Sequence, residues 1–155
     1  MEKMLKYFLA LTLASVCLVG CKPPFQRYTD IDGNRVEVQG DTVTIKGQDG
    51  LIAVAGGSNI SWPKEKMGDL PELKGTISAI VNSNEGVMLT YNDMSRPVFD
   101  AYLGSIKKQG YESEYEANMG GTLMFSGKKD DNAITLQFSS DGDKGVCVLI
   151  YMEQS

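Results

Sequence analysis

Short runs in which apolar and polar residues alternate constrain the fold of this chain more than any other feature. Alternation with a period of two is typical of β-strands that bury one face, and Gly, Asp and Asn between the runs favour tight turns. In the second half of the chain the runs occupy 77–81, 87–91, 111–117, 121–125, 133–138 and 146–152. Most connections are too short for a crossover, so neighbouring strands are predicted to be antiparallel.

A helical stripe interrupts this series of strands. Five apolar residues recur at helical spacing: Val98, Phe99, Tyr102, Leu103 and Ile106. Ser95 is a candidate N-cap, Pro97 fits the first turn, and Gly110 can end the helix. The stripe must pack on an apolar surface. The predicted fold class is therefore α+β, a mainly antiparallel β-sheet with one amphipathic helix packed on it.

A small β-meander is predicted before this domain. Branched residues alternate with polar ones at 36–38 and 43–45, a third apolar run follows at 51–54, and Gly/Asp turns separate the three. Three short strands are barely stable alone, so we expect them to pack on or extend the following sheet. The predicted organisation is a meander over 31–61 and an α+β domain over 62–155. Trp62, beside Pro63, is interpreted as a plug at the core edge.

The first residues follow the order of a secretory signal. Lys3 and Lys6 precede an apolar run over 7–19, which is shorter than the roughly 20 residues of a spanning helix. The run ends in Leu18-Val19-Gly20-Cys21, which resembles the bacterial lipobox. This resemblance implies a signal peptide over 1–20, lipid on Cys21, and a linker over 21–30. An ordinary signal peptide with an incidental cysteine, or an uncut anchor, is the alternative.

The lipobox resemblance also implies an address. The mature protein is expected in the cell envelope, held to a membrane by the lipid on Cys21. Lys22 follows the cysteine, in place of the aspartate that resembles an inner-membrane retention signal. If the cell is Gram-negative, the outer membrane is the expected location.

The charge balance argues against nucleic acid as a partner. The formal net charge is −5, and loss of 1–20 removes two lysines and one glutamate, which gives −6. An acidic chain without a basic cluster offers little to a phosphate backbone. A cation or a basic protein surface is the more plausible electrostatic partner.

The residues usually needed for catalysis are scarce. The chain has no histidine, so the commonest general base and zinc ligand are missing. Cys147 lies in an apolar run and is interpreted as a buried hydrophobe rather than a nucleophile. The chain is predicted not to be an enzyme and to use no cofactor or metal.

One carboxylate pattern leaves an enzyme as an alternative. Glu112, Glu114 and Glu116 lie two residues apart on a predicted strand, so they are expected on one face about 7 Å apart. Such a row can bind a cation or act as a hydrolytic carboxylate pair. A solvated outer face that keeps the sheet soluble is the preferred interpretation.

Three local patterns are each interpreted as structural. The segment from Asp30 to Asn34 has the carboxylate density of a calcium loop, but its glycine is misplaced for an EF-hand, so a β-turn is favoured. Asp41-Thr42-Val43 resembles an O-glycan acceptor at Thr42, and a turn entry is preferred. The sequon at Asn59 is discounted behind a bacterial lipobox.

A wider resemblance covers roughly residues 43–152. It is carried by Trp62-Pro63, by Leu73 to Ile77, and by the helix end Ile106 to Tyr111. These elements resemble an uncharacterised domain of small secreted bacterial lipoproteins, which implies no known activity. The order of one helix and four strands also resembles a cystatin-like layout, a likeness of shape alone.

Three functions remain open at this point. The leading hypothesis is a non-catalytic binding or interaction module of the cell envelope that holds an envelope protein or surface polymer near the membrane. The second is an inhibitor or assembly accessory of an envelope enzyme. The third is a carboxylate-based hydrolase that uses the glutamate row.

Overall fold

The computed structural model describes residues 25–29, 33–47, 50, 52–56, 60–140 and 142–153. Several predictions concern residues outside these ranges. They are the signal peptide over 1–20, the lipid on Cys21, the calcium-type residues Asp30 and Asp32, and the sequon at Asn59.

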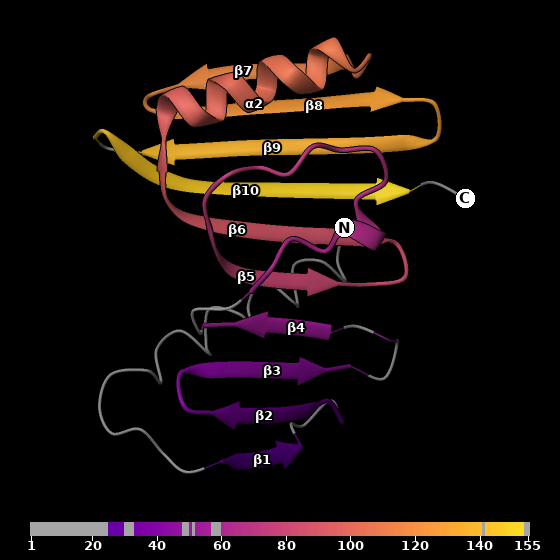
Figure 1. Ribbon diagram of the computed structural model, residues 1–155, viewed down its shortest axis with the longest axis vertical. Coiled ribbons are helices and arrows are strands. Elements are labelled where there is room, and N and C mark those ends of the chain that lie inside the picture. Colours follow the sequence, from indigo (N-terminus) through magenta and orange to yellow (C-terminus); the bar gives the residue numbers. More distant parts are fainter. Residues whose placement is uncertain are drawn as a thin grey trace.

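Ten strands form the sheet (Figure 1). They are β1 (Gln26–Thr29), β2 (Arg35–Gln39), β3 (Thr42–Lys46), β4 (Ile52–Ala55), β5 (Thr76–Asn82), β6 (Gly86–Ser95), β7 (Glu112–Met119), β8 (Thr122–Lys129), β9 (Asn132–Ser140) and β10 (Lys144–Glu153). Their order across the sheet is β1-β2-β3-β4-β5-β6-β10-β9-β8-β7. All neighbouring pairs are antiparallel, which confirms the predicted mainly antiparallel sheet.

The predicted meander continues this sheet instead of packing on it. β4 pairs directly with β5, with Val54 opposite Ile80. The hydrogen-bonding edge of β5 therefore stabilises strands that are too few to be stable alone. The sheet also includes β1, which lies within the predicted linker over 21–30. It forms because the chain folds back in a hairpin, and Tyr28 lies opposite Val36 of β2.

The helix α2 (Arg96–Lys108) runs along one face of the sheet, in front of β7 and β8 in the view of Figure 1, and contacts β6, β9 and β10. It has Ser95 at its N-cap and Pro97 in its first turn. Gly110 follows the helix with φ +95°, a conformation that a residue with a Cβ rarely adopts. These features confirm the predicted helix and both of its ends.

The buried face of α2 is narrower than predicted. Phe99, Tyr102 and Ile106 are buried, and Leu103 is partly buried against the core. Val98 is wrongly placed in the predicted stripe, because 37% of it is exposed. The helix rests on a single sheet, so only the residues that point most directly at that sheet are covered.

The core lies on one face of the sheet, which we call the helix face. The core residues of β5 to β10 point to this face, where they pack against α2 and against Met67, Leu70 and Leu73 of the preceding segment. That segment contains the short 3-10 helix η1 (Lys64–Lys66). Trp62 is partly buried against the same core, as predicted.

The opposite face, which we call the back face, has a different composition. Directly opposed residues in antiparallel strands point to the same face, so cross-strand partners define two rows that reach from β1 to β7. The first row consists of Tyr28, Val36, Ile45, Ala53, Val81, Met88, Ile150, Thr135, Ser126 and Tyr115. The second row consists of Gln26, Val38, Val43, Ala55, Ala79, Thr90, Val148, Gln137, Met124 and Ala117. Neither row contains a charged residue, although 23% of the chain is charged.

Candidate functional site

The three glutamates of β7 do not form the predicted row. The pairing of β7 with β8 shifts register between Ser113 and Tyr115, so one extra residue is accommodated there as a β-bulge. Glu112 lies opposite Lys128, whereas Glu116 lies opposite the buried Phe125. Because a one-residue insertion exchanges the two faces of a strand, Glu116 points to the helix face and Glu112 to the back face.

Lysines pair with two of these glutamates on opposite sides of the sheet. Glu114 forms an ion pair with Lys128 at 3.1 Å, and Glu116 forms one with Lys107 of α2 at 2.8 Å. Hydrogen bonds from Lys107 and Ser113 lower the pKa of the Glu116 carboxyl below its usual value. Glu116 is therefore an ionised anchor between β7 and α2, and the separation of the glutamates removes the geometric support for a shared carboxylate site.

We expect Glu116 to titrate at lower pH than an ordinary glutamate. Because its folded pKa lies below the unfolded value, the ionised carboxylate stabilises the fold above the usual glutamate pKa, and this contribution is lost as pH falls through the lowered value. Carboxyl ¹³C chemical shifts followed across an acid titration measure this pKa directly. Lys107→Ala should return the midpoint to the usual range, and an unchanged midpoint in that variant contradicts the assignment.

Cys147 is a small hydrophobic residue of the core. The side chain is fully buried, and burial raises the pKa of its thiol to about 12. At neutral pH the thiol stays protonated, and a thiol is a poor nucleophile compared with a thiolate. The structure confirms the interpretation of Cys147 as a packing residue.

Buried phenols surround this part of the core. The hydroxyls of Tyr91, Tyr102 and Tyr111 are buried and have no hydrogen-bond partner among the described residues. Burial raises the pKa of each phenol well above its ordinary value. None of the three can act as a base near neutral pH, because each stays protonated.

Two further features bear on the kind of site available. Within the described ranges, no three His, Cys, Asp or Glu residues come together in a way that could hold a metal ion. In the same part of the chain, no helix has both the length and the apolar character to cross a lipid bilayer.

A groove of about 360 Å³ lies where α2 passes over β7 and β8. Its apolar lining on the helix face is Phe99, Leu103 and Leu123, and its polar rim is Arg96, Asp100, Glu116 and Asn118. Ala117 and Met124 also border it, although their side chains belong to the back face. A few polar groups around apolar side chains are typical of binding pockets, and the volume lies in their usual range. Both walls are regular elements, so the groove is held in a fixed shape.

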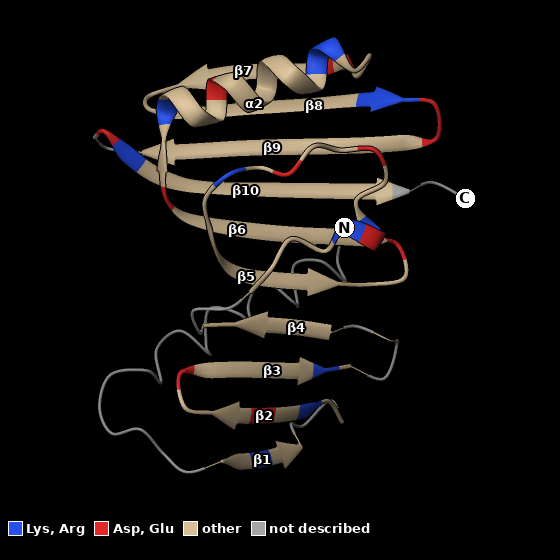
Figure 2. Cartoon of the chain, viewed as in Figure 1, with Lys and Arg blue, Asp and Glu red and all other residues tan. Residues whose placement is uncertain are grey.

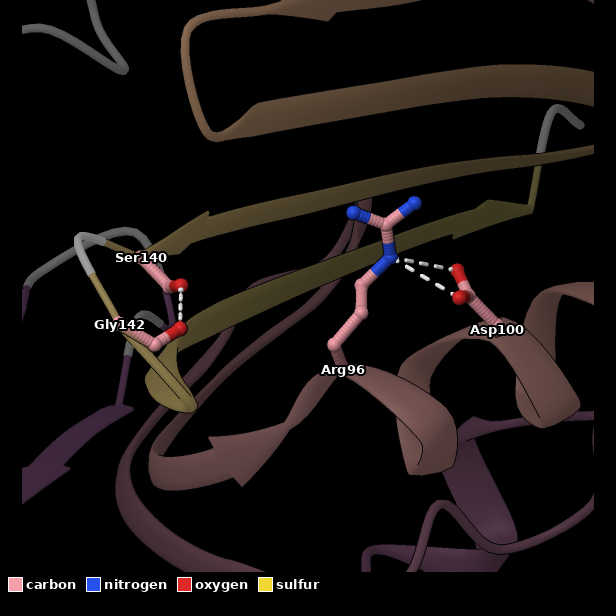
Figure 3. A network of polar contacts seen from close by, with 4 residues as sticks. All are labelled: Arg96, Asp100, Ser140 and Gly142. Atoms are coloured by element: carbon pink, nitrogen blue, oxygen red, sulfur yellow. Dashed lines mark hydrogen bonds and ion pairs between the residues drawn. The ribbon is translucent and has the colours of Figure 1, made fainter.

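Arg96 is the polar group of this groove best placed to bind a ligand. Its Nε donates hydrogen bonds to both carboxylate oxygens of Asp100, each at 2.9 Å (Figure 3). The pair spans one helical turn and holds the guanidinium in place. The contacts drawn to Asp100 in Figure 3 start from Nε alone, and the two terminal amino groups have no hydrogen-bond partner within the described part of the chain. A fork of this kind is suited to a carboxylate.

Two other hollows are polar and lie at the ends of strands. One of about 620 Å³ is lined by β6, β9 and β10 near Ser140, whose Oγ donates to the carbonyl oxygen of Gly142 at 2.6 Å (Figure 3). The other, of about 630 Å³, lies beside η1, where Lys129 pairs with Asp69 at 2.6 Å. The groove under α2 differs from both in its apolar floor.

Comparisons with protein-family models, with curated proteins and with solved structures gave no match to this chain. The resemblances to small secreted lipoproteins and to a cystatin-like layout therefore stay predictions. The proposals below depend on the geometry of the described residues and on the sequence.

The sequence singled out one residue of this groove as a candidate, Glu116, but predicted it on one strand face together with Glu112 and Glu114. It missed Arg96 and Asp100 as a polar pair, although their spacing of four residues on a predicted helix was a usable signal. It had no signal for Leu123 as part of a groove. That contact depends on which strands lie beneath the helix, and local periodicity does not contain this information.

Proposed function

We propose that the mature protein is a non-catalytic binding module of the cell envelope, held to a membrane by lipid on Cys21. The observation that carries the binding role is the groove under α2, where a fixed arginine fork stands beside an apolar floor. The two carboxylates that line the groove, Asp100 and Glu116, are each paired with a basic side chain.

The chemistry of the groove defines the partner segment. Leu103 and Leu123 are partly buried against the core and leave some apolar surface uncovered, which favours an aliphatic or aromatic side chain. The terminal amino groups of Arg96 favour a carboxylate beside it. The partner is therefore a protein segment that carries an acidic group next to an apolar one.

The anchor limits where that partner lies. Four residues separate Cys21 from the start of β1 at Gln26, and an extended chain spans at most about 3.5 Å per residue. The folded domain is thus held close to the lipid surface, in the outer membrane if the cell is Gram-negative. An envelope protein with a membrane-proximal acidic segment fits this position. The alternative function, an inhibitor or assembly accessory of an envelope enzyme, uses the same groove and differs only in which envelope protein binds there.

Arg96→Gln should weaken capture of the partner about tenfold or more, because a charge-assisted hydrogen bond contributes roughly 1.5–3 kcal/mol. The measurement is quantitative pull-down of the full chain from detergent-solubilised envelope after cross-linking in cells. Lys108→Gln is the matched control, since it removes one positive charge from an exposed position on the same helix. Both variants should fold normally.

Two outcomes of this pull-down contradict the proposal. One is the absence of any stoichiometric protein partner with the unaltered chain. The other is equal capture by Arg96→Gln and Lys108→Gln, which places the binding surface away from the groove. Arg96→Lys refines the test, because it keeps the charge and loses the fork, so it should bind nearly as weakly as Arg96→Gln.

A further inference from the structure

We infer that the back face is a docking surface for a second copy of this chain, so that two sheets pack face to face. The inference starts from the one-sided arrangement of the molecule. α2 and the segment 60–75 both lie on the helix face, and the core cluster contains no residue of the back face. A sheet with an apolar face is stable when another element covers that face.

The two central rows of the back face lack the charges that keep an exposed sheet monomeric, and the charged residues Glu112, Glu114 and Lys128 lie at the rim of this face on β7 and β8. Its two rows are uncharged from β1 to β7, and in Figure 2 charged positions of the chain gather in turns, at strand ends and on α2. Tyr115 on the edge strand β7 is 52% exposed, and Val146 on the central strand β10 is 44% exposed. Proteins usually protect exposed sheets from association with charged side chains.

The helix face of the meander shows the contrast. Arg27 pairs with Glu37 at 3.0 Å, and Lys46 lies 3.8 Å from the same carboxylate. The cross-strand pairings place these charged side chains on the helix face. In β1 to β4 the charged side is thus the helix face, outside the area that α2 and the segment 60–75 cover, and the apolar side is the back face.

The size of the back face matches a stable dimer. Ten strands at about 4.8 Å spacing span about 48 Å, and two rows along the strands cover about 14 Å, which gives a footprint of about 700 Å². A stable interface buries about 800 Å² on each partner. Met152 and Val146, in the adjoining rows, extend the footprint towards that value at the centre of the sheet, whereas Lys128 and Glu112, at the far end of the row of Met152, form a charged rim.

A second copy satisfies this surface better than a charged partner does. The protein has a formal net charge of −5, so a partner drawn by electrostatics binds elsewhere on it. A twofold axis places identical uncharged rows against each other, and twisted sheets pack face to face at about 30° with interdigitated side chains. The helix faces and their grooves then point outward.

Cysteine cross-linking in the full-length protein tests the inference in membranes. Thr90 lies on β6 near the middle of the back face, and Thr44 lies on β3 facing the other side. A bismaleimide about 10 Å long should convert Thr90→Cys to a covalent dimer on a denaturing gel, while Thr44→Cys and the parent chain stay monomeric. Cross-linking that is equal in Thr90→Cys and Thr44→Cys, or absent from both, overturns the inference.

Sedimentation of the full chain in detergent gives an independent measurement. The unaltered protein should have the mass of a dimer, and Thr90→Lys should dissociate at a concentration at least roughly tenfold higher, because two like charges meet near the axis. Thr44→Lys should remain dimeric. A monomeric unaltered chain overturns the inference even where the back face captures another protein. Partner capture through Arg96 is a separate readout, so either proposal can fail alone.

Discussion

Phe99→Ala should lower the free energy of unfolding by about 3–5 kcal/mol, the range typical of a buried phenylalanine truncated in a core. Phe99 is fully buried, and its ring stacks on Phe138 of β9 with centroids 5.3 Å apart. It links α2 to the sheet, so its loss leaves a cavity at the contact that holds the two layers together. Domains of this size have a total stability of only about 5–15 kcal/mol.

Chemical denaturation of the unaltered chain and of the variant, followed by circular dichroism, measures the difference. Val98→Ala is a control with the same chemistry, since Val98 is an apolar neighbour that is 37% exposed. Its cost should stay below about 1 kcal/mol. Equal losses in Phe99→Ala and Val98→Ala mean that α2 does not pack on the sheet through Phe99.

Cys21→Ser should abolish membrane anchoring. The serine hydroxyl does not replace the thiol that accepts the lipid, so the variant should remain an uncut precursor or appear as a protein without acyl chains. In the uncut precursor, the segment left to hold the protein to the membrane is the apolar run over 7–19, which is short for a spanning helix. Fractionation of cells and mass spectrometry of the N-terminal peptide measure both effects.

Cys17→Ser is the matched control for the anchor. Cys17 belongs to the apolar run of the predicted signal peptide, so this variant should be processed and lipidated normally. If Cys21→Ser is found in membranes at full mature length, the lipoprotein assignment is wrong. The fold and groove predictions are unaffected by that result, because they concern residues from Phe25 onward.

The local sequence pattern was sufficient for most elements of this fold, with β1 and the short helix η1 as the exceptions. Alternating residues identified strands of the meander and of the later sheet, and helical spacing with Ser95, Pro97 and Gly110 located α2. These signals are reliable because each depends on neighbours within a few residues, where backbone geometry fixes which side chains share a face. The burial of Cys147 followed from the same reasoning.

Strand pairing decided what the sequence pattern left open. The β-bulge in β7 places Glu112 and Glu116 on opposite faces of the sheet. The bulge depends on how β7 pairs with β8, so the alternation of residues within β7 does not reveal it. The pairing of β6 with β10 brings the end of the chain to the centre of the sheet.

The two surfaces proposed for binding are likewise tertiary features. The groove exists because α2 runs alongside β7 and β8, and the two uncharged rows of the back face exist because the residues of all ten strands align. The sequence by itself determined β2 to β10, α2 and most of the residues that they bury, whereas β1 forms only by pairing with β2. The tertiary structure alone decided which of these residues meet, because register and layer order depend on contacts between segments far apart in the chain.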